Sequence, residues 1–333
     1  MSASGSAPPG AAAAAGAGAG SGSGSSSSPV SGEVATRALV GELTAVLGGA
    51  RHEVRFIVVE ALGVRPGEAR PDVVPAGAAA AARAMAARRA AGEPLQYVFG
   101  HWPFRGLDLR VDPRVLIPRP ETEQVVEVAL GEARCLFAAA RPGGAGLIAV
   151  DAGTGSGAIV LALGTELGAE VVDQLWATDT SCGALEVAAV NLEACRAAGA
   201  GDLPPVALVR GSWLAPLSEG LRGHVDLVVS NPPYVTVGEW AGLDPEVRAE
   251  PREALVAGAG PGTGGAGMAD VEPVLDQARL WLGRPGAVVV ELAPHQANGA
   301  QEWARQLGYD QVRVEPDLAG RPRALVARLD GSE

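Results

Sequence analysis

The chain has 333 residues, enough for about two domains. Its net charge of -12 disfavours binding to a nucleic acid duplex, because such binding depends on basic side chains that neutralise phosphates. The three cysteines form no Cys-x-x-Cys pair, so neither a disulfide framework nor a metal site is expected. We also expect a cytoplasmic protein without membrane contact, because no apolar run is as long as a membrane span and the N-terminus lacks the pattern of a secretory signal.

Composition and charge divide the first part of the chain into two regions. Residues 1–32 consist almost entirely of Ala, Gly, Ser and Pro and carry no charge, which predicts a disordered tail. Residues 33–92 carry eight Arg and six acidic residues, and apolar side chains recur there at helical spacing. This region is predicted to form a small helical domain that serves in docking or as a lid.

Residues 93–122 are predicted to link that domain to the rest of the chain. Apolar residues alternate with polar ones on both sides of a Pro and Gly break, at Tyr97, Phe99, Leu107, Leu109 and Val111. This alternation predicts a β-hairpin. The segment 116–123 contains two prolines that favour an extended backbone, and a helix is predicted from about Glu123 with Thr122 as its N-cap.

Strands and helices alternate in residues 123–330. Strands are predicted at 147–150, 175–178, 206–210, 225–230 and 287–292, and helices at 158–167, 183–198, 271–282 and 296–307. Repeated strand–helix units predict an α/β fold with a mostly parallel sheet and helices on both faces. The last two strands, near 311–315 and 324–328, have no helix between them and predict an antiparallel hairpin at the sheet edge.

A glycine-rich motif, Asp-Ala-Gly-Thr-Gly-Ser-Gly at 151–157, follows the first strand of this series. Glycines at the carboxyl edge of a parallel sheet allow a ligand to approach the backbone closely. Asp179 ends the next strand, where an acid can accept hydrogen bonds from two ribose hydroxyls. These features predict a nucleotide-like cofactor, and both a dinucleotide and an adenosyl group fit them.

A second motif, Asn231-Pro232-Pro233-Tyr234, follows the strand at 225–230. The two prolines have no backbone N–H and a fixed φ, so the carbonyls of this segment face a ligand without competing donors. The side chain of Asn231 adds an acceptor and a donor, and Tyr234 offers a flat ring. The segment therefore predicts a slot for a planar amino group, such as an amide or a nucleobase amine.

The two motifs together are similar to those of class I S-adenosylmethionine-dependent methyltransferases that modify planar nitrogens. The stretches 92–97 (Gly-Glu-Pro-Leu-Gln-Tyr) and 116–123 (Leu-Ile-Pro-Arg-Pro-Glu-Thr-Glu) resemble, more specifically, the peptide chain release factor N(5)-glutamine methyltransferases (the PrmC/HemK family). Glu250-Pro251 followed by Ala254-Leu255 also fits this family. The resemblance covers about residues 33–330. It implies a helical substrate-docking domain at 33–92, a β-hairpin linker at 93–122 and a Rossmann-like catalytic domain at 123–330.

The resemblance also implies the reaction, the partner and the site. A methyl group would pass from S-adenosyl-L-methionine to the side-chain amide of the glutamine in the Gly-Gly-Gln loop of a release factor. The cofactor would contact Asp151, Gly153, Thr154, Gly155, Ser156, Gly157, Asp179, Trp213 and Asn231. Within this set, Asp179 would bind the ribose and Trp213 would border the adenine. Arg119 and Glu121 would shape the opening of the cofactor pocket. We expect a monomer that acts on a protein.

The substrate glutamine is assigned to Asn231, Pro232, Pro233 and Tyr234, and catalysis to Asn231, Pro232 and Tyr234. The Asn231 side-chain carbonyl and the Pro232 backbone carbonyl would accept hydrogen bonds from the substrate NH2, while Tyr234 packs on the amide plane. An amide nitrogen is a weak nucleophile, so catalysis would rest on placing it in line with the methyl group.

Several alternatives stay open at this point. A glutamine methyltransferase of another protein, such as a ribosomal protein, would carry the same motifs. An adenine-amine methyltransferase would use the same slot but would need a basic groove and aromatic side chains for a flipped base. A binding module without activity and an NAD oxidoreductase explain the Asn-Pro-Pro-Tyr segment poorly. The glycine-rich insertion at 258–267 departs from the family pattern.

Overall fold

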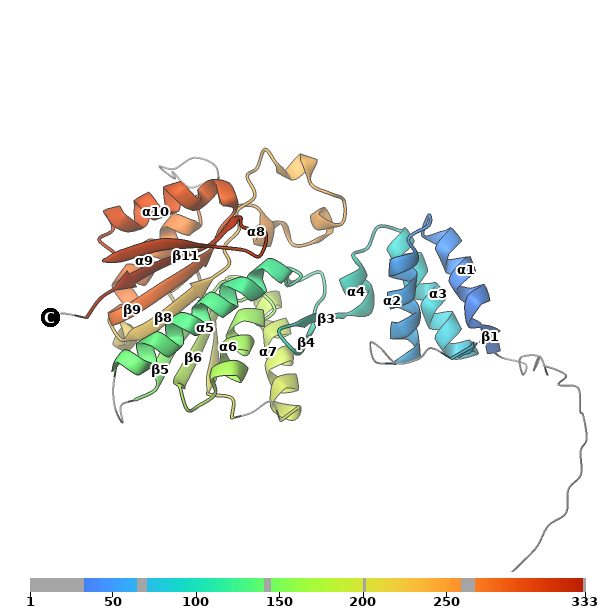
Figure 1. Cartoon of the computed structure of the whole chain (residues 1–333), viewed down its shortest axis with the longest axis horizontal. Coiled ribbons are helices and arrows are strands. Elements are labelled where there is room, and N and C mark those ends of the chain that lie inside the picture. Colours follow the sequence, from blue (N-terminus) through green and yellow to red (C-terminus); the bar gives the residue numbers. More distant parts are fainter. Residues whose placement is uncertain (1–32, 65–70, 141–144, 200–201, 259–266, 332–333) are drawn as a thin grey trace, which may run out of the picture.

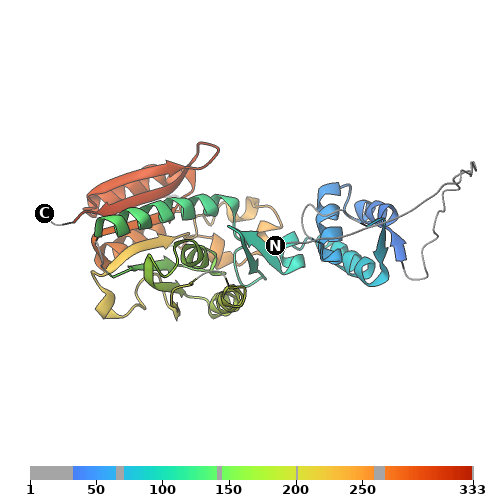
Figure 2. The same cartoon turned by 60° about the horizontal axis from the view of Figure 1, so that its bottom comes forward.

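The computed structural model describes residues 33–64, 71–140, 145–199, 202–258 and 267–331. The tail predicted at 1–32 and most of the glycine-rich insertion therefore lie outside the described residues. Figures 1 and 2 show a helical unit at one end of the molecule and a larger α/β unit at the other, joined by a short linker.

The helical unit is built from three helices, α1 (Thr36–Val46), α2 (Arg51–Leu62) and α3 (Ala76–Ala90). Their apolar faces meet in a separate core whose members include Leu39, Leu43, Val54, Ile57 and Val58. Two short strands that the sequence pattern did not predict, β1 (Glu33–Ala35) and β2 (Val73–Pro75), pair antiparallel beside these helices. The predicted helical character of residues 33–92 is confirmed.

The linker contains a hairpin, but it begins later than predicted. The strands β3 (His101–Phe104) and β4 (Leu107–Arg110) pair antiparallel, whereas Leu95–Phe99 forms the short helix α4. The prediction that Tyr97 and Phe99 lie in a strand is therefore wrong. The adjacent Tyr97 and Val98 are both buried, which a strand with alternating faces does not favour. The helix ends at Gly100, whose φ of 81° is left-handed.

The long helix α5 (Pro120–Ala140) begins three residues before the predicted start. Proline is tolerated in the first turn of a helix because its missing N–H has no partner there in any case. Thr122 consequently lies inside the helix and does not serve as its N-cap, in contrast to the prediction. Its hydroxyl instead donates a hydrogen bond to the carboxylate of Glu291, at 2.7 Å.

The α/β unit is organised around a seven-stranded sheet in the order β10-β11-β9-β8-β5-β6-β7. The strands are β5 (Leu147–Ala152), β6 (Val172–Asp179), β7 (Val206–Arg210), β8 (Val225–Ser230), β9 (Leu282–Glu291), β10 (Gln311–Pro316) and β11 (Pro322–Leu329). Strands β5 to β9 pair parallel with their neighbours, and β10 and β11 form an antiparallel hairpin that extends the sheet beside β9. The predicted mostly parallel sheet with an antiparallel edge hairpin is confirmed.

Helices cover both faces of this sheet (Figure 2). The helices α5, α6 (Ala158–Leu167) and α7 (Cys182–Ala197) lie on one face, and α9 (Val271–Trp281) and α10 (Ala297–Gln306) lie on the other. Successive residues of β8 point to opposite faces, so Leu227 and Val229 belong to the core under α5 and α6 while Val228 belongs to the core under α9. This double coverage explains why the central strands β5 and β8 are mostly apolar and buried on both faces.

The chain reverses direction across the sheet between β5 and β8. After β5 it continues to β6 and β7 on one side, then returns to place β8 on the other side of β5. In open α/β sheets, ligands bind outside the carboxyl ends of the strands at such a switch point. The glycine-rich motif follows β5 and the Asn-Pro-Pro-Tyr segment follows β8, so the topology brings the two motifs to one crevice.

Candidate active site

A cavity of about 610 Å³ lies at the carboxyl edge of the sheet, between the two motifs. It is lined by the glycine loop, the ends of β6 and β8 and the extended segment before α5. Of the residues predicted to bind cofactor or substrate, those that line it are Gly153, Thr154, Gly155, Ser156, Asp179, Trp213, Asn231 and Pro233. Asp151 and Gly157 are not among the described residues that line this cavity.

The glycine loop turns sharply because three of its glycines adopt a left-handed backbone, with φ of 81° at Gly153, 55° at Gly155 and 84° at Gly157. The N–H groups of Gly153 and Thr154 both donate to the carbonyl of Thr178, each at 2.9 Å, which fixes the loop to the end of β6. A Cβ atom on Gly153 would lie 3.1 Å from the Trp213 ring. The close contact with this ring therefore requires glycine at 153.

Asp151 lies beneath the loop, with 1% of its surface exposed. Its Oδ2 accepts hydrogen bonds from the Thr154 hydroxyl at 2.7 Å and from the Val160 N–H at 3.1 Å. Burial raises the pKa of Asp151 to about 7. The side chain thus joins the loop to the first turn of α6, and its geometry is that of a support for the loop.

Asp179 lies where β6 ends and faces the cavity. Its Oδ2 accepts the N–H of Gly155 and its Oδ1 accepts the N–H of Ser181, both at 2.9 Å. Burial raises the pKa of Asp179, and these backbone donors oppose that shift. An ionised carboxylate has lone pairs beyond those used here, so Asp179 can still accept hydrogen bonds from a ligand.

Trp213 has a backbone conformation that its residue type does not favour, with φ of 49°. Two contacts hold it. Its carbonyl accepts the Thr178 hydroxyl at 2.7 Å, and the following N–H, of Leu214, donates to Gln277 at 2.9 Å. The conformation places the indole ring beside Gly153 at the cavity wall. A non-glycine residue held in this region is a feature found often at functional sites.

The Asn-Pro-Pro-Tyr segment is joined to the glycine loop through the preceding residue. The hydroxyl of Ser230 donates to the carbonyl of Ala152 at 2.6 Å, so the ends of β5 and β8 are tied together. Asn231 and Pro233 line the large cavity. Tyr234 instead lines a smaller cavity of about 190 Å³, together with Arg119, Glu121, Glu291 and Arg323.

Pro232 is not among the described residues that line either cavity. Arg119 lines both, so the two cavities lie next to each other on either side of Arg119. Burial raises the pKa of Tyr234, and the nearby Glu291 raises it further. The ring of Tyr234 is therefore neutral at ordinary pH and presents an uncharged face.

Two motifs that lie far apart in the sequence meet at the cavity. Arg119, in the 116–123 stretch, forms an ion pair with Glu250, which begins the Glu-Pro stretch at 250–251. The other carboxylate oxygen of Glu250 accepts the N–H of Ile117 at 2.9 Å. Burial raises the pKa of Glu250, and the Arg119 charge opposes the shift. The pair holds the extended segment before α5 against the wall of the cavity.

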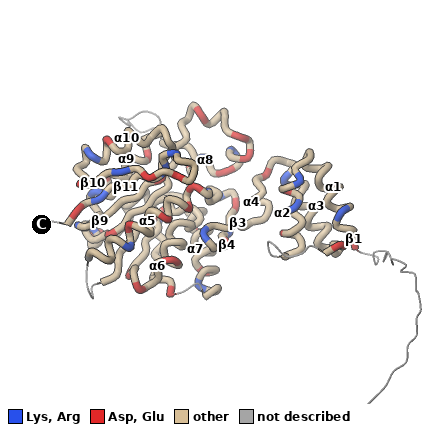
Figure 3. The backbone as a smooth tube through the Cα atoms, viewed as in Figure 1, with Lys and Arg blue, Asp and Glu red and all other residues tan. Residues whose placement is uncertain are grey.

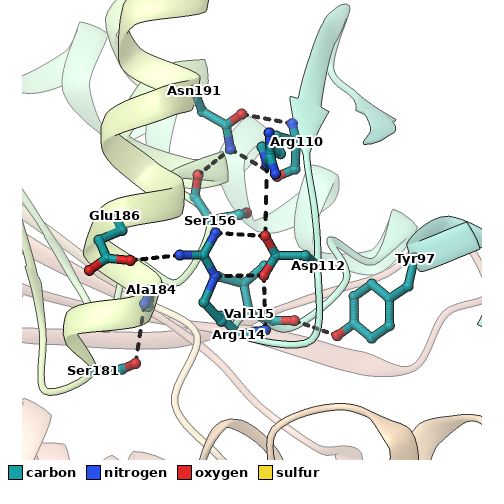
Figure 4. A network of polar contacts seen from close by, with 10 residues as sticks. All are labelled: Tyr97, Arg110, Asp112, Arg114, Val115, Ser156, Ser181, Ala184, Glu186 and Asn191. Carbon is teal, nitrogen blue, oxygen red and sulfur yellow. Dashed lines mark hydrogen bonds and ion pairs between the residues drawn. The ribbon is translucent and has the colours of Figure 1, made fainter. Parts of the chain in front are cut away.

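Asn191 is a buried residue of α7 that the sequence reasoning missed. Its Oδ1 accepts the N–H of Arg110 at 2.7 Å, and its Nδ2 donates to the carbonyls of Arg110 and Ser156. Figure 4 shows it between the end of β4 and the glycine loop, with the Arg114 guanidinium nearby between Asp112 and Glu186. Asn191 thereby joins the linker to the glycine loop. A lone Asn on a helix gives no sequence signal for such a role.

Similarity to known proteins extends over most of the chain. Residues 36–100 match the family described as PrmC N-terminal domain. The release factor glutamine methyltransferase of Moorella thermoacetica is 40% identical over 242 residues, which cover 72% of this chain and 76% of that protein. The protein of the same name from Cereibacter sphaeroides is 35% identical over 300 residues, which cover 89% of this chain and 97% of that protein. The chain belongs to the release factor glutamine methyltransferase family.

A third member of this family, from Burkholderia pseudomallei, is 37% identical over 263 residues, 77% of this chain and 84% of that protein. Membership of the release factor glutamine methyltransferase family confirms three predictions made from the motifs. The family itself is the one predicted, the chain is a methyltransferase, and S-adenosyl-L-methionine is its methyl donor. Over the described residues, no helix has the length and apolar character needed to cross a bilayer.

Proposed function

We propose that this chain methylates the side-chain amide nitrogen of the glutamine in the Gly-Gly-Gln loop of peptide chain release factors, with S-adenosyl-L-methionine as donor. The observation that carries this proposal is the position of the Asn-Pro-Pro-Tyr segment between two cavities. The larger cavity, beside the glycine loop, suits the methyl donor and reaches Asn231, which would hold the acceptor amide, while Tyr234 lies on the side of the smaller cavity. The relatives named release factor glutamine methyltransferase support the choice of acceptor.

The residues of the larger cavity fit an adenosyl group with a methionine tail. Asp179 would accept hydrogen bonds from the ribose hydroxyls, since it lies at the end of β6 with free lone pairs. Trp213 would lie against the adenine, and the backbone of Gly153 to Ser156 would follow the rest of the donor. Asp151 and Gly157 would act through the shape of the loop, because they lie on its side away from the cavity.

When bound, the donor supplies an electrophilic methyl group next to sulfur. The chain's own contribution is to place the acceptor nitrogen. The Asn231 side-chain carbonyl and the Pro232 backbone carbonyl would accept the two N–H bonds of the substrate amide, and the Tyr234 ring would pack on the amide plane. Correct placement of two reactants is worth up to roughly 7–11 kcal/mol of the barrier. Closure of the site against water strengthens each of these polar contacts.

The division of labour follows the predicted domains. Residues 123–330 would carry the reaction, residues 93–122 would connect, and the helical unit at 33–92 would help to dock the release factor. Support comes from Arg89 of α3, which forms ion pairs both with Glu53 of α2 and with Glu246, in the segment that leads to the cavity wall at 251–258. The helical unit is thus joined directly to the segment beside the active site.

A protein substrate fits the charges around the site better than a nucleic acid does. The segment 239–253, which follows the Asn-Pro-Pro-Tyr motif, carries five acidic residues and two basic ones: Glu239, Asp244, Glu246, Glu250 and Glu253 against Arg248 and Arg252. Figure 3 shows acidic positions along this loop near α8 (Arg252–Leu255), and basic positions scattered over the molecule. Glu246 and Glu250 are ion-paired with arginines outside the segment, so the segment offers phosphates no excess of basic side chains. We place the enzyme in the cytoplasm, where release factors act, as a monomer.

The test is label transfer from tritiated S-adenosyl-L-methionine to a purified release factor. A matched release factor with the loop glutamine changed to alanine serves as the control. The proposal predicts label on the first protein and none on the second. Equal labelling of both, or labelling of neither while the donor still binds, would contradict it and direct attention to another protein or to a nucleic acid.

A further inference from the structure

A line of three side chains runs from the end of β9 to the proposed catalytic amide. Glu291, the last residue of β9, has 1% of its surface exposed, and Thr122, in the first turn of α5, has 4%. The Thr122 hydroxyl donates to Oε2 of Glu291 at 2.7 Å. The same hydroxyl oxygen accepts a hydrogen bond from Nδ2 of Asn231 at 3.3 Å. Three elements distant in sequence therefore meet behind Asn231.

The order of donors and acceptors along this line is fixed by the number of protons. A hydroxyl has a single proton, and an ionised carboxylate has none to give. Above a pH of about 7, where Glu291 with its raised pKa is ionised, Thr122 must therefore direct its proton toward Glu291, and its oxygen is left as an acceptor toward Asn231. Only the NH2 end of the Asn231 amide can bond to it. A flipped amide would place two oxygens against each other with no proton between them.

The consequence falls on the other end of the same amide. With Nδ2 held by Thr122, Oδ1 of Asn231 is directed away from Thr122 and accepts no hydrogen bond from the part of the chain that the structure describes. An asparagine amide that could rotate freely would present its NH2 end to the substrate nitrogen for part of the time. Two NH2 groups that face each other cannot form the orienting bond, because neither has an acceptor lone pair to offer.

We propose that Thr122 and Glu291 are positioning residues that fix the rotation of the Asn231 amide, so that its carbonyl oxygen faces the substrate nitrogen. This proposal rests on the proposed function, because it assigns a role to Oδ1 of Asn231 in that reaction. It also explains why a carboxyl group is buried directly after the apolar run at 287–290. A buried charge is costly unless it is paired or hydrogen-bonded, and here it orders a hydroxyl.

The test compares three substitutions of threonine in the full chain. Thr122→Val removes the hydroxyl with little change in shape and should lower kcat on the release factor roughly tenfold. Thr122→Ser keeps the hydroxyl and should restore most of that loss. The matched control is Thr165→Val in α6, since the Thr165 hydroxyl bonds only to the Leu161 and Ala162 carbonyls of its own helix. This variant should keep the wild-type kcat.

Two further readouts separate positioning from a general structural role. The affinity for S-adenosyl-L-methionine, measured by calorimetry, should stay within about threefold of wild type in Thr122→Val. In an Asn231→Ala background, Thr122→Val should cause no additional loss of kcat, because the amide that it orients is gone. Thr122→Ala serves in place of Thr122→Val if the latter does not fold, with the same expected results.

The outcomes distinguish this inference from the proposed function. The positioning role would be overturned if Thr122→Val has the wild-type kcat, or if it lowers kcat equally with Asn231 intact and in Asn231→Ala. In either case, methylation of the release factor by the wild-type chain would still support the proposed function. A wild-type enzyme that labels no release factor would overturn both. The inference would be supported if Thr122→Val lowers kcat when Asn231 is intact, causes no further loss in Asn231→Ala, and Thr122→Ser restores the activity.

Discussion

The ends of β5 and β8 are neighbours in the sheet, yet they build their parts of the site by different means. After β5 the chain exposes backbone, through glycines whose left-handed conformation and lack of side chains leave room for a ligand. After β8 the chain exposes side chains and carbonyls on a segment that two prolines make rigid. One end suits close contact with a large ligand, and the other suits the orientation of a small group.

The same two ends share one structural feature. Each rests on a buried carboxyl group that accepts a threonine hydroxyl at 2.7 Å, Asp151 with Thr154 under the glycine loop and Glu291 with Thr122 behind Asn231. Burial raises the pKa of both carboxyl groups to about 7. The difference between the ends therefore lies in what they present to a ligand. Substitutions at the β5 end should change donor affinity, and those at the β8 end should change turnover.

The largest expected effect is at the β8 end. Asn231→Ala removes the side-chain acceptor proposed for the substrate amide, and a lost hydrogen bond of this kind is worth about 1–3 kcal/mol, or roughly 5- to 150-fold in kcat. The affinity for S-adenosyl-L-methionine should change little. Steady-state methylation and calorimetry on the same preparation check both parts. A variant that methylates at the wild-type rate would remove Asn231 from the mechanism.

The next effect is expected at the β5 end. Gly153→Ala adds a Cβ atom that would lie 3.1 Å from the Trp213 ring, at a residue whose φ is 81°. We expect donor affinity to fall about tenfold, because either the loop or the ring must move. Gly106→Ala is the matched control, since Gly106 in the β3–β4 turn has a φ of 79° and open space around it. That control should lose stability but keep donor affinity.

A smaller effect is expected from Asp179→Ala. This change removes the carboxylate assigned to the ribose and also the acceptor for the Gly155 N–H. Affinity for S-adenosyl-L-methionine should fall by several fold to about tenfold, because water can take the place of the carboxylate as acceptor for part of the lost hydrogen bonding. At a saturating donor concentration, kcat should recover toward the wild-type value. Unchanged affinity in calorimetry would contradict the ribose assignment.

The smallest expected effect is on stability and concerns the two buried carboxyl groups, Asp151 and Glu291, that accept threonine hydroxyls. Each carboxyl group has a pKa of about 7 in the folded chain, above its value in the unfolded chain. Between those two pKa values the folded chain binds more protons than the unfolded chain, so the free energy of unfolding falls as pH rises from about 4 to about 7. Asp151→Asn and Glu291→Gln remove this titration. The urea midpoint of each variant, relative to wild type, should therefore rise with pH across that window and level off above it. A constant difference would contradict the raised pKa values.

Local signals in the sequence account for much of the fold. The helix predicted at 158–167 matches α6, which two glycines flank, and the strand predicted at 206–210 matches β7, which a proline and a glycine flank. The two motifs predicted to meet do so at the switch between β5 and β8. Tyr97 was placed in a strand because apolar alternation over a few residues does not distinguish a strand from a short buried helix.

What the sequence did not predict depends on contacts between distant segments. Nothing local indicates that Trp213 has a positive φ, which hydrogen bonds from Thr178 and to Gln277 hold in place. Thr122 was predicted to cap a helix, but its partner is 169 positions away. A signal for that partner was present, since Glu291 directly follows the apolar run at 287–290. A charged residue in such a place needs a partner.

The most direct test of the account is to find which atom receives the methyl group. The wild-type chain, a release factor and unlabelled S-adenosyl-L-methionine would be incubated, and the loop peptide would be sequenced by tandem mass spectrometry. We predict one added methyl group on the glutamine side chain of the Gly-Gly-Gln loop, lost in parallel in the Asn231→Ala variant. Methylation at another residue, or at this glutamine with no dependence on Asn231, would contradict the account.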